Sequence, residues 1–373
     1  MKIIKFFYRL FRYPAEWSKQ IREIQIRKNQ AREIKNFNRD ANKLIVFFVP
    51  GADYITGKET ISGGLISIVS LAEESRKIFS DDTSTEVICC TYFGDHLLFE
   101  LTTFENTTPV LEYRQLPRYF RNTSSIILHV PELFVEDFYF NQLANLKFDI
   151  ENLQLNILNQ NIDLMPQDNI VSMTRGKFKQ VTITTAHKKY CTSGFREQYN
   201  VPLHLLSVWI SPEKYIRTPF TEKKDLILFS PDDFDLTREI IELIKTKLPQ
   251  FETRIINGLS YNQYKELIGE AKFVITTGEG LDAYFIETYF SGGVAYALKN
   301  RNFFDEKYLD LPCLFENKAN SGNELLYSIE KYNNPVNYSF LTESVANLLC
   351  GDYSSTLYQD NIRKFYKKEF TYA

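Results

Sequence analysis

The pattern of apolar and polar positions predicts strands that alternate with amphipathic helices along most of the chain. Residues 272–276 (KFVIT) form an apolar run typical of a buried strand, and residues 282–290 carry apolar side chains at helical spacing. Ser291-Gly292-Gly293 stops this helix, and a second apolar run follows at residues 294–298. A strand, a loop, a helix and a second strand in this order form the unit of a doubly wound parallel sheet.

The first half of the chain shows the same alternation. Residues 44–49 form a nearly continuous apolar strand, and Gly63-Gly64 leads into a helix that ends near residues 73–77. Four further strands are predicted at residues 86–92, 125–130, 153–159 and 181–185. Two stretches are also locally rich in β-forming residues, 99–104 and 154–165. In the second half, strands and helices are predicted at residues 226–230, 236–248, 252–256, 261–268, 341–349 and 358–370.

Composition narrows the class of protein. A chain of 373 residues with 44% hydrophobic and 15% aromatic residues can bury enough surface for two globular domains. Its five cysteines contain no C-x-x-C spacing and are odd in number, so neither a disulfide framework nor a zinc site is indicated. The four histidines, at positions 96, 129, 187 and 204, also lack metal-site spacing. We therefore expect a cytoplasmic protein that needs no metal or other cofactor.

Positive charge is concentrated at the N-terminal end. Residues 1–43 contain 12 Lys or Arg and 4 Asp or Glu, whereas the whole chain has a net charge of −3. In residues 1–20, apolar and basic side chains fall on opposite faces of a helix, namely Ile3, Phe6, Phe7, Leu10 and Phe11 against Lys2, Lys5, Arg9 and Arg12. This pattern predicts peripheral attachment to an anionic membrane surface, and the alternative is a helix that packs on the protein's own domain. The run is too short to span a membrane, and the acidic remainder of the chain argues against a nucleic-acid partner.

Two glutamates mark the predicted site. In doubly wound sheets the loops at the carboxyl ends of the strands form the binding crevice, so we expect Glu279 at the mouth of a site. Glu287 follows eight residues later, slightly more than two helical turns, so both carboxylates can face one pocket. The helix between them starts at that pocket, where its free N–H groups and its dipole favour an anion such as a phosphate.

This pattern resembles a known signature. Glu279-x7-Glu287 followed by Ser291-Gly292-Gly293 is similar to the E-x7-E motif of retaining glycosyltransferases of the fourth family, which have the GT-B fold. The resemblance implies an α/β protein with two Rossmann-like doubly wound domains that face a central cleft. It also implies that Glu279 lies beside the donor sugar as a catalytic residue and that Glu287 holds the nucleotide ribose. The neighbouring residues expected at the nucleotide are Gly278, Gly280 and Leu281. The alternative is that Glu279 caps a helix and Glu287 is a solvated helix residue.

Two features of the first half fit the same resemblance. The strand that ends Ile126-Ile127-Leu128-His129, before Val130-Pro131, is similar to the strand end where the family places a histidine beside the donor sugar. His129 is therefore a second catalytic candidate, and the alternative is a strand-end histidine bound by the backbone. Gly63-Gly64 resembles the turn where the backbone approaches the donor phosphates or the acceptor, and the alternative is a flexible turn.

The resemblance also implies a domain division. The order of residues 186–190, 195–202 and 209–215 matches the segment through which the family's chain passes into its second domain, so the linker is expected near residues 205–222. The expected parts are basic N-terminal helices at 1–43, an acceptor domain at 44–210, a nucleotide-sugar domain at 211–345 and returning C-terminal helices at 346–373.

The chain departs from the family pattern at one position. Ser230-Pro231-Asp232-Asp233 stands where the family has an arginine, followed downstream by a lysine, that neutralises the departing diphosphate. The charge is reversed, so another cation or a helix dipole must replace the pair. The basic residues considered as substitutes are Lys188, Lys189, Arg196 and Arg238, of which Lys188 and Arg196 are taken as donor-binding candidates. The amide side chains of Asn156, Asn159, Gln160 and Asn161 could contact sugar hydroxyls, although asparagine is also a common turn former, which we prefer.

The sequence thus predicts a hexosyltransferase that moves a sugar from a nucleotide sugar to a glycan or lipid-linked acceptor. The expected setting is synthesis of a bacterial surface polysaccharide, such as a capsule, an O-antigen of lipopolysaccharide or an exopolysaccharide, at the inner face of the cytoplasmic membrane. The resemblance implies retention of the anomeric configuration. The alternatives are a nucleotide-sugar epimerase on the same fold and a non-catalytic assembly subunit that binds sugar nucleotides, which the missing cation pair keeps open.

Overall fold

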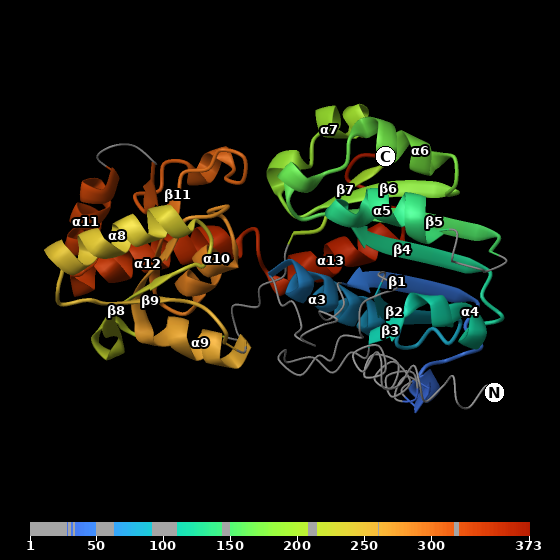
Figure 1. Ribbon diagram of the computed structural model, residues 1–373, viewed down its shortest axis with the longest axis horizontal. Helices are drawn as coiled ribbons and strands as arrows, with labels where there is room; N and C mark the ends of the chain where they lie inside the picture. Colours follow the sequence, from blue (N-terminus) through green and yellow to red (C-terminus); the bar gives the residue numbers. More distant parts are fainter. Residues whose placement is uncertain are drawn as a thin grey trace, which may run out of the picture. The chain divides into compact units, whose positions relative to one another are not determined.

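The computed structural model describes residues 28, 31–32, 34–49, 63–91, 110–143, 150–207, 215–259, 261–316 and 321–373. The predicted amphipathic helix at 1–20, the β-rich stretch at 99–104 and residues 208–214 of the predicted linker lie outside these residues. The described residues form two parallel sheets with flanking helices, as the apolar pattern predicted (Figure 1).

The first sheet has seven strands in the order β3-β2-β1-β4-β5-β6-β7. The pairs β1–β2, β1–β4, β2–β3, β4–β5 and β6–β7 all run parallel. The strands are β1 (Lys43–Val49), β2 (Thr85–Thr91), β3 (Val110–Glu112), β4 (Ser125–Pro131), β5 (Asn152–Asn159), β6 (Gln180–Thr185) and β7 (Leu203–Leu205). The α-helices described along this part of the chain are α3 (Gly63–Ile78), α4 (Leu116–Tyr119), α5 (Val135–Asp137), α6 (Asp168–Arg175) and α7 (Ser193–Tyr199).

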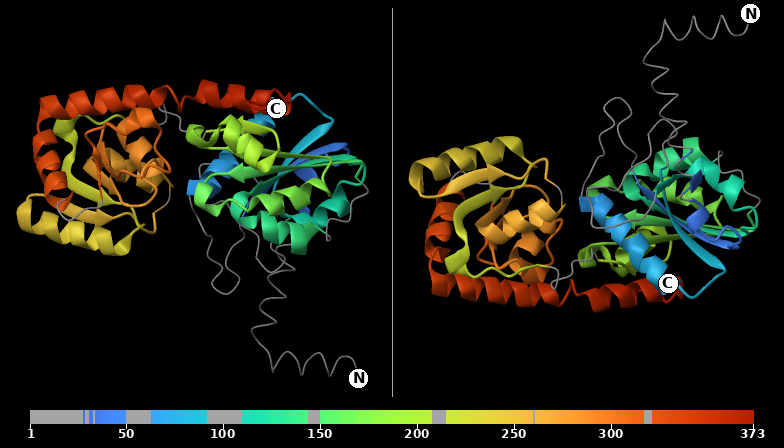
Figure 2. Two further views of the ribbon diagram at one scale, coloured as in Figure 1. Left: turned by 90° about the horizontal axis from the view of Figure 1, so that it is seen from above. Right: turned by 90° about the horizontal axis from the view of Figure 1, so that it is seen from below.

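The second sheet has five parallel strands in the order β12-β11-β10-β8-β9, with helices on both faces (Figure 2). Its strands are β8 (Lys224–Phe229), β9 (Glu252–Ile255), β10 (Ala271–Thr276), β11 (Val294–Leu298) and β12 (Leu314–Phe315). The helices that follow β8 along the chain are α8 (Phe234–Lys247), α9 (Tyr261–Glu270), α10 (Ala283–Phe290), α11 (Ser321–Tyr332), α12 (Pro335–Cys350) and α13 (Ser355–Tyr366).

Each sheet reverses its strand order at one point. In the second sheet the chain passes from β8 to β9 on one side and then returns to β10 on the other side of β8. In the first sheet β1 is flanked in the same way by β2 and β4. Ligands of open α/β sheets bind outside the carboxyl ends of the strands at such a switch point. The topology therefore directs attention to the carboxyl ends of β8 and β10 and of β1 and β4.

The central unit of the second sheet follows from its sequence. Every residue of β10 is buried, as expected for a strand covered on both faces. Helix α10 ends at Phe290, and Gly292 follows with φ of +75°. A Cβ atom added at Gly292 would lie 2.6 Å from the Thr218 carbonyl oxygen, so both the backbone angle and the space require glycine. The predicted glycine stop is confirmed.

Aromatic side chains fill the core of the second sheet. Phe273 of β10 is fully buried and contacts the rings of Phe251, Tyr296 and Tyr338, with centroids 5.6 to 6.0 Å apart. The tilted and edge-to-face arrangements suit aromatic quadrupoles. The high aromatic content of the sequence is thus used for packing around the strand that carries the predicted site.

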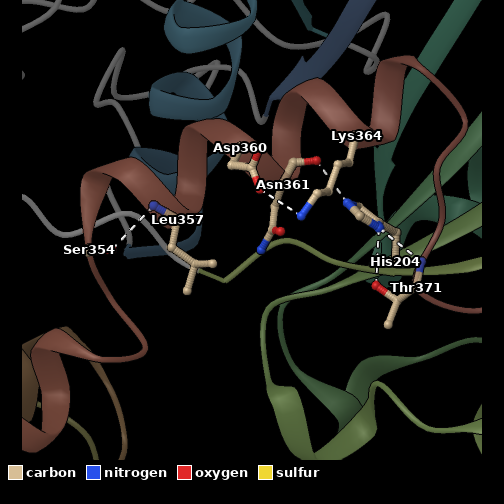
Figure 3. Close-up of polar contacts among 7 residues, drawn as sticks. All are labelled: His204, Ser354, Leu357, Asp360, Asn361, Lys364 and Thr371. Carbon is tan, nitrogen blue, oxygen red and sulfur yellow. Dashed lines mark hydrogen bonds and ion pairs between the residues drawn. The ribbon is translucent and has the colours of Figure 1, made fainter.

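The segment after α13 lies along the edge of β7 (Figure 3). Leu203 and Tyr372 exchange two backbone hydrogen bonds of 2.8 and 2.9 Å. His204 is buried, and its Nε2 lies 2.8 Å from the Asn361 carbonyl oxygen, while the N–H of Thr371 donates to Nδ1 over 3.2 Å. Since the Asn361 oxygen can only accept, Nε2 carries the proton and His204 is neutral. Residues 371 and 372 therefore cover β7, which is an edge strand of the seven-stranded sheet.

The described residues divide into two compact units. The first comprises the described residues up to Leu158 together with Leu164–Thr182, and the second comprises Asn159–Asp163 together with Ile183–Ala373. The expected division at residue 345 falls inside α12, which runs without a break from Pro335 to Cys350. In the described part of the chain, no helix is both long and apolar enough to cross a membrane.

Some element boundaries differ from the prediction. Gly63 and Gly64 do not form a turn but are the first two residues of α3. The β-rich stretch predicted at 154–165 ends as a strand at Asn159, and a 3₁₀ helix follows at Ile162–Leu164. The last helix ends at Tyr366, not at residue 370. Glycine at the first helical turn lacks the side chain on which periodicity depends, so pattern alone does not reveal such a start.

Candidate functional site

The carboxyl ends of β8 and β10 lie side by side at the switch point of the five-stranded sheet. The loops that follow them contain Asp232 and Glu279. A Cβ atom added at Gly278 would lie 2.7 Å from both Cγ and Oδ2 of Asp232, so the Asp232 carboxylate lies directly on the Gly278 backbone. Glycine at 278 thus leaves room for the Asp232 side chain in this position, which places a second carboxylate close to Glu279.

Hydroxyl groups fix these two loops to each other. The N–H of Thr277 donates to Ser230 Oγ over 3.3 Å, and Thr237 Oγ1 of α8 lies 3.0 Å from Thr277 Oγ1. All three residues are buried. The first turn of α8 and the loop after β10 are thus held in one arrangement, which gives the acidic side chains a rigid base.

Glu279 is half-buried and contacts a side chain of the same compact unit, that of Asn161. Asn161 Nδ2 donates to Glu279 Oε1 over 2.6 Å. Burial and the charges of Asp232 and Asp163 raise the pKa of Glu279, and the hydrogen bond from Asn161 opposes the rise. The site thus favours protonation of this carboxyl group, and Asn161 favours its ionised form.

Asp282 caps the helix that follows. Its Oδ1 accepts the N–H of Phe285 over 2.9 Å, and its Oδ2 accepts the hydroxyl of Thr276 over 2.6 Å. Burial raises the pKa of Asp282 to about 7, aided by the charges of Asp232 and Glu279 and opposed by both hydrogen bonds. From the sequence we expected the free N–H groups at the start of α10 to bind a phosphate. In the structure, however, the Phe285 N–H donates to Asp282.

Glu287 lies in the interior of the protein, with only 5% of its surface exposed. Burial raises the pKa of Tyr264 well above its usual value, and the charge of the Glu287 carboxylate raises it further. Burial also raises the pKa of Tyr284 to about 12, with contributions from Asp232, Asp282 and Glu287 in that order. Three carboxylates therefore act on the pKa of one tyrosine, and the buried Glu287 is not the solvated helix residue of the alternative interpretation.

Gly280 and Leu281 have structural roles in the loop. Gly280 has φ of +90°, and an added Cβ would lie 2.6 Å from Phe304 Cε2 and 2.7 Å from the Leu298 carbonyl oxygen. Leu281 is buried and packs in the core of the second sheet. Glycine at 280 is thus required by the backbone, and the side chain of Leu281 points into the core and leaves only its backbone for a ligand.

Two of the predicted donor-binding cations lie close to other parts of the second unit. Arg196 Nε donates to the carbonyl oxygen of Ala373 over 3.0 Å. Burial raises the pKa of Asp305, and the charges of Lys188 and Lys189 partly offset that rise. Closer to the predicted site, burial raises the pKa of Glu279, Asp282 and Tyr284, and the charge of Asp232 adds to the rise in each case.

Arg238 has a different environment, in the first turns of α8. Its guanidinium lies 4.5 Å from the ring centroid of Phe234, a side chain that is 60% exposed. The adjacent residue, Thr237, contacts Thr277 directly before Gly278. Arg238 is thus the candidate cation whose helix is tied to the loop of Glu279.

His129 belongs to the first unit and is fully buried. It lies in β4, two residues before the end of the strand, and its ring stacks on Phe47 with centroids 4.2 Å apart. Asn156 Nδ2 lies 3.0 Å from His129 Nδ1, and Asn156 Oδ1 accepts the Thr182 hydroxyl over 2.9 Å. Burial lowers the pKa of His129 to about 3, so the ring is neutral. The described contacts of His129 are thus with the side chains of Asn156 and Phe47, and its role at a donor sugar remains a prediction.

Gly63 and Gly64 also belong to the first unit, at the start of α3. An added Cβ at Gly63 would meet no heavy atom within 4 Å, so the described surroundings do not demand glycine there. Their proposed approach to donor phosphates remains a prediction. In the part of the chain that the structure describes, no group of three His, Cys, Asp or Glu side chains is arranged to hold a metal ion.

Sequence reasoning missed three contributors to the site. Asp232 was noted only as a departure from the family, Asn161 was preferred as a turn residue, and Asp282 was not singled out. Asp282 had a readable signal, because an aspartate directly before an apolar helical run is a common N-cap. Asp232 and Asn161 come close to Glu279 from the loops that follow β8 and β5. The spacing of residues along the chain does not reveal that these loops are neighbours.

Comparison with known proteins supports the fold. Neither protein-family models nor curated proteins gave a match to this sequence. Among solved structures, the chain is similar to Anabaena Alr3699/HepE in complex with UDP and glucose, with a TM-score of 0.60 at 8% identity, covering 87% of this chain and 99% of that one. It is also similar to an alpha-glucosyltransferase in complex with UDP-glucose and DNA that contains an abasic site, with a TM-score of 0.58 at 10% identity. That match covers 87% of this chain and 98% of the other. A third similar structure is a glycosyltransferase from Rickettsia africae ESF-5, with a TM-score of 0.54 at 12% identity. That match covers 88% of this chain and 98% of the other.

These neighbours span almost the whole chain, and their folds are of the GT-B type. The predicted α/β class with two doubly wound parallel sheets is therefore confirmed, and the chain has the GT-B fold. At 8 to 12% identity the similarity establishes fold alone, because one fold supports many functions.

Proposed function

We propose that this protein is a glycosyltransferase that takes its sugar from a nucleotide donor, and that the donor is a UDP-sugar. The observation that carries the proposal is the position of Glu279, half-buried beside Asp232 at the switch point of the second sheet. Ligands of such sheets bind at this point. Two neighbours of the same fold have UDP-glucose, or UDP and glucose, bound.

Glu279 is assigned to the donor sugar and Glu287 to the nucleotide ribose. A carboxylate accepts hydrogen bonds from hydroxyl groups and stabilises positive charge that develops on a sugar ring. We propose transfer with retention, by attack from the face that the diphosphate leaves, because no second catalytic carboxylate is then needed. The protein contributes mainly by positioning the reactants, and the reaction needs no bound metal.

The carboxylates at the strand ends repel a diphosphate, so a cation has to offset them. We assign this role first to Arg238, because its helix is tied to the loop of Glu279 and its guanidinium lies over the exposed Phe234 ring. Stacking on an aromatic ring leaves the N–H groups at the edge of the guanidinium available for phosphate oxygens. Lys188 and Arg196 remain weaker candidates.

The acceptor and the cellular setting are proposed from the sequence resemblance and from the charge pattern of residues 1–20. We propose a glycan or lipid-linked acceptor and a role in the synthesis of a bacterial surface polysaccharide such as a capsule or lipopolysaccharide. The protein is then a cytoplasmic enzyme that attaches peripherally to the inner face of the membrane through residues 1–20, whose basic and apolar faces suit anionic lipid. One observation favours a second candidate, a non-catalytic sugar-nucleotide-binding subunit: the reversed charge at Asp232.

Release of UDP from a panel of UDP-sugars, with and without a membrane extract as the acceptor source, tests the proposal. We expect release by the wild type from one donor and a loss of about 100-fold in Glu279→Gln, because the substitution removes a charge at the reacting sugar and preserves shape. Glu266→Gln, on the exposed side of α9, is the matched control and should keep full activity. Binding without any turnover would favour the non-catalytic subunit, and conversion of the donor sugar without an acceptor would favour an epimerase.

A further inference from the structure

The side chain of Asn161 contacts Glu279 across a long interval of sequence. Asn161 follows β5, and its Nδ2 donates to Glu279 Oε1 over 2.6 Å, although the two residues are 118 positions apart. Both lie in the second compact unit, and both are half-buried. A short, charge-assisted hydrogen bond of this kind is worth more than a neutral one. The contact is therefore a candidate for a functional role.

The orientation of the Asn161 amide is fixed by a second hydrogen bond. Its Oδ1 accepts the backbone N–H of Asp163 over 2.9 Å, which forms a turn typical of asparagine. Because the oxygen of the amide is used by the turn, the NH₂ group faces Glu279, whose oxygens can only accept when ionised. The turn preferred from the sequence is present, and it serves to aim the amide.

We propose that Asn161 is a positioning residue, which holds Oε1 of Glu279 and so presents Oε2 of an ionised carboxylate to a hydroxyl group of the donor sugar. The role in sugar binding rests on the proposed function, whereas the control of Glu279 by Asn161 does not.

The charges around Glu279 explain why such a residue is needed. Burial, Asp232 and Asp163 all favour the protonated form of Glu279, whereas the Asn161 hydrogen bond favours the ionised form. A protonated Glu279 would carry a hydrogen on one oxygen and would lose the negative charge that a reacting sugar ring requires. Loss of the Asn161 amide should therefore change both the orientation of the Glu279 carboxyl group and its ionisation.

Two substitutions separate these effects. Asn161→Asp keeps an oxygen to accept the Asp163 N–H but removes the donor to Glu279 and adds a negative charge. Asn161→Ala removes the donor without adding charge. The control is Asn347→Asp on the exposed face of α12, which adds the same charge away from the site.

The primary readout is the pKa of Glu279, measured by carbon NMR on protein labelled at the glutamate carboxyl carbon and assigned with Glu279→Gln. We expect the pKa to rise by about 1 unit in Asn161→Ala, and further in Asn161→Asp, with no change in Asn347→Asp. A merely structural role for Asn161 would leave this pKa unchanged in folded Asn161→Ala, and that result would overturn the proposal.

The second readout uses the donor. In Asn161→Ala we expect kcat/KM for a UDP-sugar to fall about tenfold, with the acidic limb of its pH profile moved upward by the same shift as the Glu279 pKa. If the Glu279 pKa changes but the pH profile of kcat/KM does not, Asn161 has no role in sugar binding. If the pKa moves but the wild type binds no nucleotide sugar, the proposed function fails while the control of Glu279 by Asn161 stands.

Discussion

Asp282 is the carboxyl group whose environment has the clearest measurable consequence. It is half-buried at the N-cap of α10, and its two hydrogen bonds do not offset the cost of burial next to Asp232 and Glu279. Its pKa is about 7 in the folded protein, against 3.8 for an ordinary aspartate. In the folded state the ionised form is therefore disfavoured, and the protein gives up stability as pH rises from about 4 towards 7.

Asp282→Asn should remove this loss. Asparagine caps helices as well as aspartate does, and its amide can still pair with Thr276, so the cap is kept while the charge is removed. We expect the variant to be more stable than the wild type at pH 8 by about 1 to 2 kcal/mol, a value that allows for partial exposure of the side chain. The difference should be smaller at pH 5. Denaturant unfolding of both proteins at the two pH values measures it.

The matched control is Asp233→Asn. Asp233 is the N-cap of α8 and accepts the N–H of Leu236 in the same manner, but it is exposed. Because asparagine keeps the N-cap, this substitution should leave the free energy of unfolding at pH 8 unchanged within about 0.5 kcal/mol. Two results would contradict this account: a wild type that is more stable than Asp282→Asn at pH 8, or a stability difference that does not vary with pH. Either would show that ionisation of Asp282 does not destabilise the folded protein.

Single residues differ in how far the sequence reveals them. The spacing of Glu279 and Glu287, the preceding strand and the glycine stop are local features, and each could be read directly. Asn161 and Asp232 could not, because their contacts depend on which strands become neighbours in the folded sheet. For His129, the sequence placed the residue on the right strand but could not reveal that its side chain is fully buried against Phe47.

The contacts of the segment that follows α13 depend on the protonation of His204. His204 of β7 accepts the Thr371 N–H at Nδ1 and faces the Asn361 carbonyl oxygen with Nε2 (Figure 3). A proton on Nδ1 would confront the N–H of Thr371 and break that hydrogen bond. Burial and the nearby Lys364 lower the pKa of His204, and the Asn361 hydrogen bond partly opposes them. The neutral ring is thus the form that fits.

This arrangement predicts a loss of stability in acid. Because the folded pKa of His204 is lowered, its contribution is complete above the ordinary histidine pKa of about 6.5 and falls as pH drops below it. His204→Gln does not titrate and can make the same two hydrogen bonds. Between pH 7.5 and 5.5 we expect the wild type to lose about 1 kcal/mol more than His204→Gln in denaturant unfolding. Equal losses in the two proteins would contradict the arrangement.

Elements were predictable where the apolar pattern is strong. The predicted runs at 44–49, 272–276 and 294–298 correspond closely to β1, β10 and β11. The edge strand β3 was missed, since three residues are too few for a pattern, and the end of α13 was set too late. The pairing of residue 372 with β7 could not be foreseen, because a single bridge between distant residues has no periodicity.

For the molecule as a whole, the order of elements was enough to predict an α/β protein with parallel sheets, because alternating strands and helices limit the chain to a few topologies. The GT-B class itself was expected only from the resemblance carried by Glu279, Glu287 and the glycines that follow, and the solved structures confirm it. Fold neighbours at 8 to 12% identity show how little of the sequence this architecture requires. Donor, acceptor and membrane attachment depend on side chains at the loops and on residues 1–20, and so they remain proposals.

The most direct measurement is calorimetric binding of UDP, UDP-glucose and other nucleotide sugars to the purified protein, repeated with Glu279→Gln and Glu266→Gln. We expect one UDP-sugar to bind the wild type and Glu266→Gln equally, and to bind Glu279→Gln about tenfold more weakly, a difference of about 1.4 kcal/mol. Binding of no nucleotide to the folded wild type would contradict a sugar-nucleotide site at the ends of β8 and β10, as would equal affinity in Glu279→Gln.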